Sequence, residues 1–113
     1  MKIGMVGLGR MGANMAERLR LAGHEAIGYD RNPETTEVAS LDELVSGLER
    51  PRTIWSMVPS GDATEETIRA LAELLDEGDL VVDGGNSYFR DSLRRAEELH
   101  GRGILFCDAG VSG

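Results

Sequence analysis

The segment KIGMVGLGRMG, residues 2–12, decides the fold of this chain of 113 residues. Lys2–Val6 is mostly apolar and predicts a short buried strand, and three glycines follow it at the spacing G-x-G-x-x-G. Apolar side chains then recur at helical spacing until Gly23, which predicts a helix directly after the glycines. A strand, a tight glycine turn and a helix in this order are typical of the start of a βαβ unit.

The rest of the sequence alternates between predicted strands and predicted helices. Further strands are expected at residues 24–30, 53–58, 79–83 and 104–108. Further helices are expected at residues 41–48, 64–75 and 87–101, the first of them after the capping-box pattern Ser40-Leu41-Asp42-Glu43. Strands rich in Val and Ile that alternate with helices predict the α/β class. We expect one domain over residues 1–113, with a Rossmann-like, doubly wound parallel sheet in a three-layer αβα arrangement.

Composition excludes several classes of function. The net charge of −8 argues against a nucleic-acid partner, which requires a basic face. No stretch is apolar and long enough to span a membrane, and the N-terminus has no signal-type segment, so we expect a cytoplasmic protein. Cys107 is the single cysteine, which excludes an internal disulfide and favours a reducing compartment. It is expected to be a small buried apolar residue rather than a reactive thiol.

The glycine turn predicts a dinucleotide site at the carboxyl edge of the sheet. Gly7 would make the turn, Gly9 would let the backbone approach a pyrophosphate, and Gly12 would let the helix pack closely on the strand. The first N–H groups of the helix would then point at the phosphates. Asp30 ends the second predicted strand, at the place where a carboxylate binds the adenosine ribose hydroxyls.

The two residues that follow the second strand indicate different cofactors. Asp30 favours NAD, because a carboxylate repels the 2′-phosphate of NADP. Arg31 has three possible roles, which are to pair with that phosphate, to stack on adenine, or to be a solvated turn residue. The prediction is therefore NAD in preference to NADP.

Three further segments lie where predicted strands end, at the same edge. Met57, Val58 and Pro59 would form an apolar wall under a dinucleotide, although simple strand-end packing explains them nearly as well. DGGNSYFRDS, residues 83–92, combines two glycines with Asn86, which would either contact a ligand or cap the next helix. CDAGVSG, residues 107–113, ends in a small polar turn that suits an anionic or hydroxylated ligand.

With GLGRMGANMAERL, YDRNP, MVP, DGGNSYFRDS and CDAGVSG in this order, the sequence resembles the 6-phosphogluconate dehydrogenase family. More narrowly, it resembles the shorter bacterial type within the β-hydroxyacid dehydrogenase superfamily, and DGGNS is more specific than the glycine turn or the VSG turn. The resemblance implies an oxidoreductase of the pentose phosphate pathway and of gluconate utilisation. Such an enzyme oxidises the C3 hydroxyl of 6-phosphogluconate by hydride transfer to NAD(P)⁺, releases CO₂ and forms ribulose 5-phosphate without a metal.

The resemblance also implies roles for individual residues. Asn86, Ser112 and Gly113 are assigned to the substrate, a sugar-phosphate acid. Contacts with the cofactor are assigned to Gly7, Leu8, Gly9, Arg10, Met11, Gly12, Asp30, Arg31, Asn32, Met57, Val58, Pro59 and Asn86.

Two departures from the family pattern qualify these roles. The family's catalytic lysine and glutamate are expected beyond Gly113, on a helical domain through which the family forms homo-oligomers. The 113 residues alone are therefore expected to bind but not to turn over substrate. Only about nine residues, Pro33 to Leu41, stand where relatives have a longer helix and a short strand, so the second crossover is shortened.

Two alternative functions stay open from the sequence. One is a 3-hydroxyisobutyrate or tartronate-semialdehyde type of dehydrogenase, but those relatives usually carry proline in place of Gly110 and lack DGGNS. The other is a non-catalytic NAD-binding module, which would leave Asn86 and the last turn without a substrate.

Overall fold

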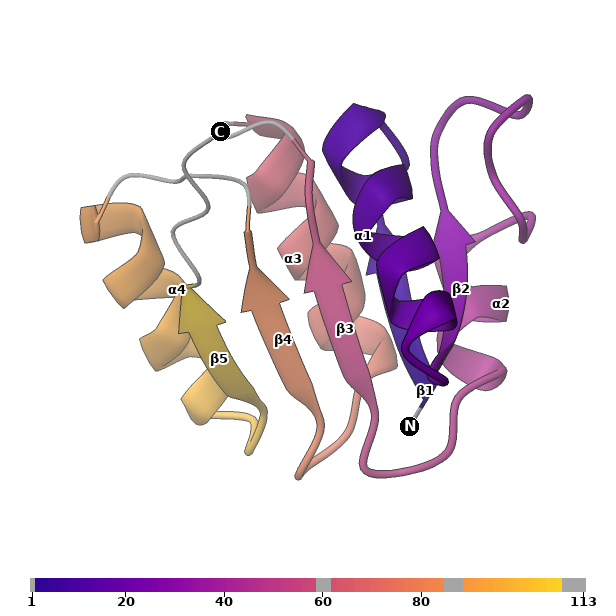
Figure 1. Cartoon of the computed structure of the whole chain (residues 1–113). Coiled ribbons are helices and arrows are strands. Elements are labelled where there is room, and N and C mark those ends of the chain that lie inside the picture. Colours follow the sequence, from indigo (N-terminus) through magenta and orange to yellow (C-terminus); the bar gives the residue numbers. More distant parts are fainter. Residues whose placement is uncertain (1, 59–61, 85–88, 109–113) are drawn as a thin grey trace.

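The computed structural model describes residues 2–58, 62–84 and 89–108. In this part of the chain the elements are, in order, β1 (Lys2–Val6), α1 (Arg10–Leu21), β2 (Glu25–Tyr29), α2 (Leu41–Ser46), β3 (Thr53–Ser56), α3 (Asp62–Leu74), β4 (Leu80–Asp83), α4 (Phe89–His100) and β5 (Leu105–Asp108). All strands pair in parallel, in the order β2-β1-β3-β4-β5 (Figure 1). The predicted α/β class and parallel sheet are confirmed, with boundaries that differ from the prediction by two residues at most.

The chain reverses direction across the sheet after β2. The crossover through α1 leads from β1 outward to β2, whereas the crossover through α2 passes β1 and continues to β3. Because such crossovers are right-handed, a reversal places the helices on opposite faces. Figure 1 shows α1 in front of the sheet and α2 and α3 behind it. The point of reversal, between β1 and β3, is where ligands bind in open α/β sheets.

The main hydrophobic core lies between the sheet and the layer of α2, α3 and α4. Leu44 of α2, Leu71 of α3 and Leu99 of α4 are almost fully buried against Ile54 and Val81 of the sheet. A second, smaller set of buried side chains lies under α1 and includes Met5 and Ala16. Burial of both faces of β1 explains why its sequence is apolar without alternation.

The α1 side of β3, β4 and β5 is not covered by any helix of the described residues. Leu105 on β5 is 50% exposed, and Trp55 and Leu80 are only half-buried. Cys107 is also exposed, so the expectation of a buried cysteine is wrong. The reason is its position on an edge strand, on the face that α1 does not reach.

The short segment after β2 closes the free edge of the sheet. The Gly28 N–H donates to Glu37 Oε1 (2.7 Å), and the Glu37 N–H donates to the Gly28 carbonyl (3.0 Å). Arg20 Nη2 donates to the Ala26 carbonyl (2.8 Å) and to Glu37 Oε1 (2.6 Å). The Asp30 N–H donates to Thr36 Oγ1 (3.0 Å). These contacts satisfy strand groups that would otherwise be free to pair with another chain.

The helix after this segment begins as its sequence predicts. The Ser40 hydroxyl accepts from the Glu43 N–H (3.1 Å), while the Glu43 carboxylate accepts from the Ala39 N–H (2.9 Å). This is a capping box in which the return hydrogen bond lies one residue earlier than usual.

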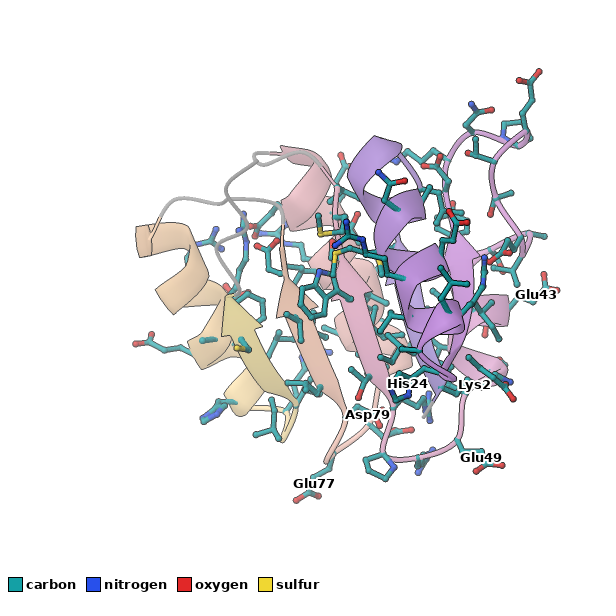
Figure 2. All side chains as sticks on the ribbon, viewed as in Figure 1. Lys2, His24, Glu43, Glu49, Glu77 and Asp79 are labelled. Atoms are coloured by element: carbon teal, nitrogen blue, oxygen red, sulfur yellow. The ribbon has the colours of Figure 1, made fainter. Side chains whose placement is uncertain are left out.

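The amino edge of the sheet is stabilised by charges of its own. Asp79 is 0% exposed, and its carboxylate accepts from the backbone N–H groups of Arg52 (2.6 Å) and Asp76 (2.8 Å). Arg52 Nη2 in turn pairs with Asp76 at 3.0 Å. Figure 2 shows Asp79 with Lys2, Glu49 and Glu77 at this edge, where the strands begin. The predicted site is at the opposite edge, so these charges do not contribute to it.

Among the helices of the described residues, none is both long and apolar enough to cross a membrane.

Candidate functional site

Hydrogen bonds that continue the sheet gather the predicted site at its carboxyl edge. The Gly7 N–H donates to the Tyr29 carbonyl (2.9 Å), and the Met57 N–H donates to the Val6 carbonyl (2.7 Å). The Gly84 N–H donates to the Ser56 carbonyl (2.8 Å). The residues that follow β1, β2, β3 and β4 therefore lie side by side, as parallel pairing requires.

The structure explains two of the three glycines of the turn from within the protein. Gly7 has a φ of +91°, in the left-handed region that favours glycine. A Cβ at Gly12 would overlap the Gly7 carbonyl oxygen, because α1 packs directly on the turn. A Cβ at Gly9 would meet no atom within 4 Å. The backbone at Gly9 thus borders open space, and glycine there is not required by packing.

The N-terminus of α1 suits an anion. Gly9 is the N-cap residue, and no side chain of the described residues caps the helix. The first N–H groups of a helix have no partner within the helix and carry the positive end of its dipole. A pyrophosphate approaching over Gly9 would satisfy these donors without a basic side chain.

Asp30 is half-buried and held in place by two neighbours. Its Oδ1 accepts from the Arg31 N–H (3.0 Å), and its Oδ2 accepts from the Thr35 hydroxyl (2.5 Å). Each carboxylate oxygen has two lone pairs, so one on each oxygen stays available for a ribose hydroxyl. Thr35 is a contributor that the sequence reasoning missed, because a threonine inside a polar turn gives no periodic signal.

The next two residues make contacts within the protein. Arg31 Nη2 pairs with Glu66 Oε2 on α3 at 2.9 Å. Asn32 Oδ1 accepts from the Glu34 N–H (3.0 Å), and the backbone carbonyl of Asn32 accepts from the N–H groups of Thr35 and Thr36. Asn32 therefore shapes the turn that presents Asp30, and this role is independent of a ligand.

The apolar wall is only partly available to a ligand. Met57 is half-buried, and its sulfur accepts from Trp55 Nε1 (3.0 Å). Val58 packs against the main core, and the Leu8 side chain is buried. For Leu8, only the backbone faces the predicted pyrophosphate site. A Cβ at Gly84 would lie 2.5 Å from Met57 Sδ, so packing already explains the first glycine of DGGNS.

An ion-pair network fixes the end of β4, from which DGGNS starts. Asp83 and Arg95 are buried, and Arg95 Nη1 lies 3.8 Å from Asp83 Oδ2. Arg95 Nε and Arg94 Nη2 both donate to Glu65 Oε2, at 3.0 and 2.9 Å. The hydrogen bond from Arg94, assisted by Arg95 and opposed by burial, lowers the pKa of Glu65 from 4.5 to about 2. The network ties α3, β4 and α4 together at the carboxyl edge.

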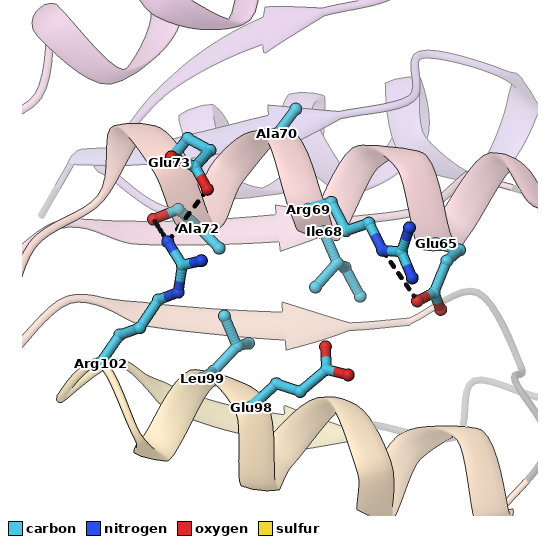
Figure 3. A pocket seen from close by; sticks show the side chains of 9 residues that line it. All are labelled: Glu65, Ile68, Arg69, Ala70, Ala72, Glu73, Glu98, Leu99 and Arg102. Atoms are coloured by element: carbon cyan, nitrogen blue, oxygen red, sulfur yellow. Dashed lines mark hydrogen bonds and ion pairs between the residues drawn. The ribbon is translucent and has the colours of Figure 1, made fainter.

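One groove among the described residues lies apart from the predicted site. A groove of about 540 Å³ runs between α3 and α4, with Ile68 and Leu99 in its lining and Arg102–Glu73 and Arg69–Glu65 ion pairs beside it (Figure 3). None of the predicted site residues lines it. The described residues contain no group of three or more His, Cys, Asp or Glu side chains placed to hold a metal.

Several predicted site residues lie outside the described part of the chain. These are Pro59, Asn86, Ser112 and Gly113, and for Arg10 and Met11 only the backbone is described. Their roles stay predictions.

Relatives in the sequence comparison agree on one kind of enzyme. Residues 2–113 match the family model described as the NAD binding domain of 6-phosphogluconate dehydrogenase. The decarboxylating 6-phosphogluconate dehydrogenase of Chlamydia pneumoniae is 40% identical, over 98% of this chain and 26% of its own. An NAD⁺-dependent decarboxylating 6-phosphogluconate dehydrogenase of Haloferax volcanii is 41% identical, over 100% of this chain and 40% of its own. That alignment covers 122 positions, so the relative has additional residues within the matched region.

Solved structures agree on the fold. Plasmodium falciparum 6-phosphogluconate dehydrogenase has a TM-score of 0.88 at 26% identity, over 94% of this chain and 26% of its own. Mycobacterium tuberculosis 3-hydroxyisobutyrate dehydrogenase has the same TM-score and identity, over 99% of this chain and 40% of its own. The chain spans about a quarter to two-fifths of the length of the curated relatives it matches. It belongs to the family of the NAD-binding domain of 6-phosphogluconate dehydrogenase.

Proposed function

We propose that this chain binds NAD⁺ at the carboxyl ends of β1, β2 and β3, as the cofactor domain of an enzyme that oxidatively decarboxylates 6-phosphogluconate. The observation that carries the proposal is the glycine turn. Gly12 packs on Gly7, the N-terminus of α1 has no side-chain cap among the described residues, and Gly9 borders open space. Together these features form a cradle for a pyrophosphate.

Asp30 supports NAD⁺ over NADP⁺. Thr35 and the Arg31 N–H hold its carboxylate, leaving lone pairs for ribose hydroxyls, and the same charge repels a 2′-phosphate. The Haloferax volcanii relative is named as NAD⁺-dependent, whereas the Plasmodium falciparum structures include a complex with NADP⁺. The preference in this chain therefore rests on its own residues.

The bound nicotinamide would accept the hydride from C3 of the substrate. Asn86, Ser112 and Gly113 are proposed to contact the sugar-phosphate acid. A general base must take the C3 hydroxyl proton during hydride transfer, and a general acid must protonate the enediol left after CO₂ departs; both are proposed to come from outside residues 1–113. The relatives that are about 40% identical are named for 6-phosphogluconate, which supports this substrate over 3-hydroxyisobutyrate. The likeness to a 3-hydroxyisobutyrate dehydrogenase structure supports only the shared fold.

Calorimetric titration with NAD⁺ and NADP⁺ tests the proposal. We expect NAD⁺ to bind more tightly, and Asp30→Asn to weaken NAD⁺ about tenfold through loss of a charged hydrogen bond. Asp42→Asn is the matched control, because Asp42 lies in the first turn of α2 and not in the proposed site. A folded chain that binds neither dinucleotide contradicts the proposal, as does equal weakening by the two substitutions.

A further inference from the structure

One ion pair spans the two sides of the proposed cofactor crevice. Arg31 follows β2, and Glu66 lies on α3, the helix that follows β3. Their charged atoms are 2.9 Å apart, and the side chains are 68% and 69% exposed. The turn after β2 and helix α3 border the position where the adenosine half of a dinucleotide binds in this class of sheet. The pair therefore stands at the adenosine end of the crevice, and a ligand can compete with it.

Arg31 is the basic residue on which a 2′-phosphate would depend. Between Asp30 and Ser40 the sequence contains no other lysine or arginine, whereas Glu34 and Glu37 add negative charge. Arg20 pairs with Glu37 and is thereby occupied. A phosphate that arrives beside Asp30 would need the guanidinium of Arg31, which can bind it with two hydrogen bonds. That guanidinium is engaged by Glu66.

We infer that Glu66 is a specificity-determining residue that acts through Arg31. By holding the guanidinium, Glu66 lowers the affinity for the 2′-phosphorylated dinucleotide relative to NAD⁺. The inference rests on the proposed function, since it needs a dinucleotide in this crevice. It also removes the conflict between Asp30 and Arg31, because the arginine that would favour NADP⁺ is already paired. Glu66 itself touches no reacting atom and is a positioning residue.

Glu66→Gln tests the inference, because it keeps the size of the side chain and removes its charge. The dissociation constants of NAD⁺ and NADP⁺ are measured by calorimetry at one fixed, low salt concentration. We expect NADP⁺ to bind about two- to fivefold more tightly, the range set by exposed ion pairs, while NAD⁺ binding stays the same. Glu34→Gln is the control, since it removes the same charge from the turn that carries Arg31.

The same two constants are measured in an Arg31→Met background to show whether Glu66 acts through the arginine. We expect Glu66→Gln to give no gain in NADP⁺ affinity when Arg31 is replaced, because the effects of two coupled residues are not additive. A gain that persists without Arg31 overturns the inference, because Glu66 would then repel the phosphate directly. An equal gain for both dinucleotides, or an equal gain from Glu34→Gln, also overturns it.

The experiment separates this inference from the proposed function. If the parent chain is folded and binds neither dinucleotide, both are wrong. If the parent chain binds NAD⁺ and Glu66→Gln leaves the NADP⁺ to NAD⁺ ratio unchanged, the inference about Glu66 alone is wrong. Thermal unfolding of each variant is followed in parallel, and we expect Glu66→Gln to unfold close to the parent because the pair is exposed.

Discussion

Alanine at Gly9 should separate cofactor binding from folding. A Cβ at this position meets no atom within 4 Å, and the φ of −66° and ψ of −173° are allowed for alanine. Alanine is a poorer N-cap than glycine, but it also lowers the entropy of the unfolded chain. These two effects oppose each other, so we expect the free energy of unfolding to change by less than about 0.5 kcal/mol.

The same methyl group should weaken NAD⁺ strongly. It would occupy the open space over the N-terminus of α1, through which a pyrophosphate must approach the first N–H groups. Loss of one charge-assisted hydrogen bond costs about 1.5–3 kcal/mol, which is about a 10- to 150-fold rise in the dissociation constant. Calorimetric titration measures the dissociation constant, and urea unfolding measures the stability.

Gly12→Ala is the matched comparison, because it adds the same methyl group one helical turn away. Its Cβ would overlap the Gly7 carbonyl oxygen and lie 3.0 Å from the Gly7 carbonyl carbon. Backbone must then shift, and we expect a loss of about 1–3 kcal/mol of stability. If Gly9→Ala binds NAD⁺ as tightly as the parent chain, the pyrophosphate does not lie over Gly9 and the reasoning is refuted. A large loss of stability in Gly9→Ala would equally refute it.

Three further predictions concern stability. Glu65→Gln should flatten the pH dependence of the free energy of unfolding between pH 4.5 and about 2. The lowered pKa of Glu65 stabilises the fold above pH 4.5, and this contribution is lost as the pH falls through about 2. Glu37→Ala should cost about 1–2 kcal/mol in urea unfolding by leaving the Gly28 N–H unpaired, whereas Glu34→Ala should cost little. Asp79→Ala should cost about 3 kcal/mol without changing NAD⁺ affinity, whereas exposed Glu77→Ala should cost almost nothing.

The sequence predicted the framework because local signals and burial agree there. Val6 and Val81 lie in short apolar runs, which are typical of buried strands in a parallel sheet. Ser40 and Glu43 form a capping pattern that marks the start of α2. The glycine turn was predicted with its register, and the structure gives a conformational reason for Gly7 and a steric reason for Gly12. These signals act over a few residues, so they can be read without knowing the sheet order.

The sequence did not predict contacts between segments that are distant along the chain. Arg20 with Glu37, and Arg31 with Glu66, are exposed polar residues whose pairing depends on the sheet order. Cys107 was expected to be buried because its strand is apolar, but burial depends on which face a helix covers. Polar residues in a turn have no periodicity from which their partners can be inferred.

The short crossover need not disable the proposed site. The six-stranded order 3-2-1-4-5-6 becomes 2-1-3-4-5 when its third strand along the chain is missing, and β1, β2 and β3 keep their places around the crevice. The edge that such a strand would cover is closed by Arg20, Thr36 and Glu37. Thr35, from the same segment, holds Asp30. The proposed pyrophosphate cradle and Asp30, the carboxylate proposed to bind ribose, are therefore both retained. We therefore expect the short crossover to affect contacts with adenine more than contacts with the pyrophosphate or the ribose.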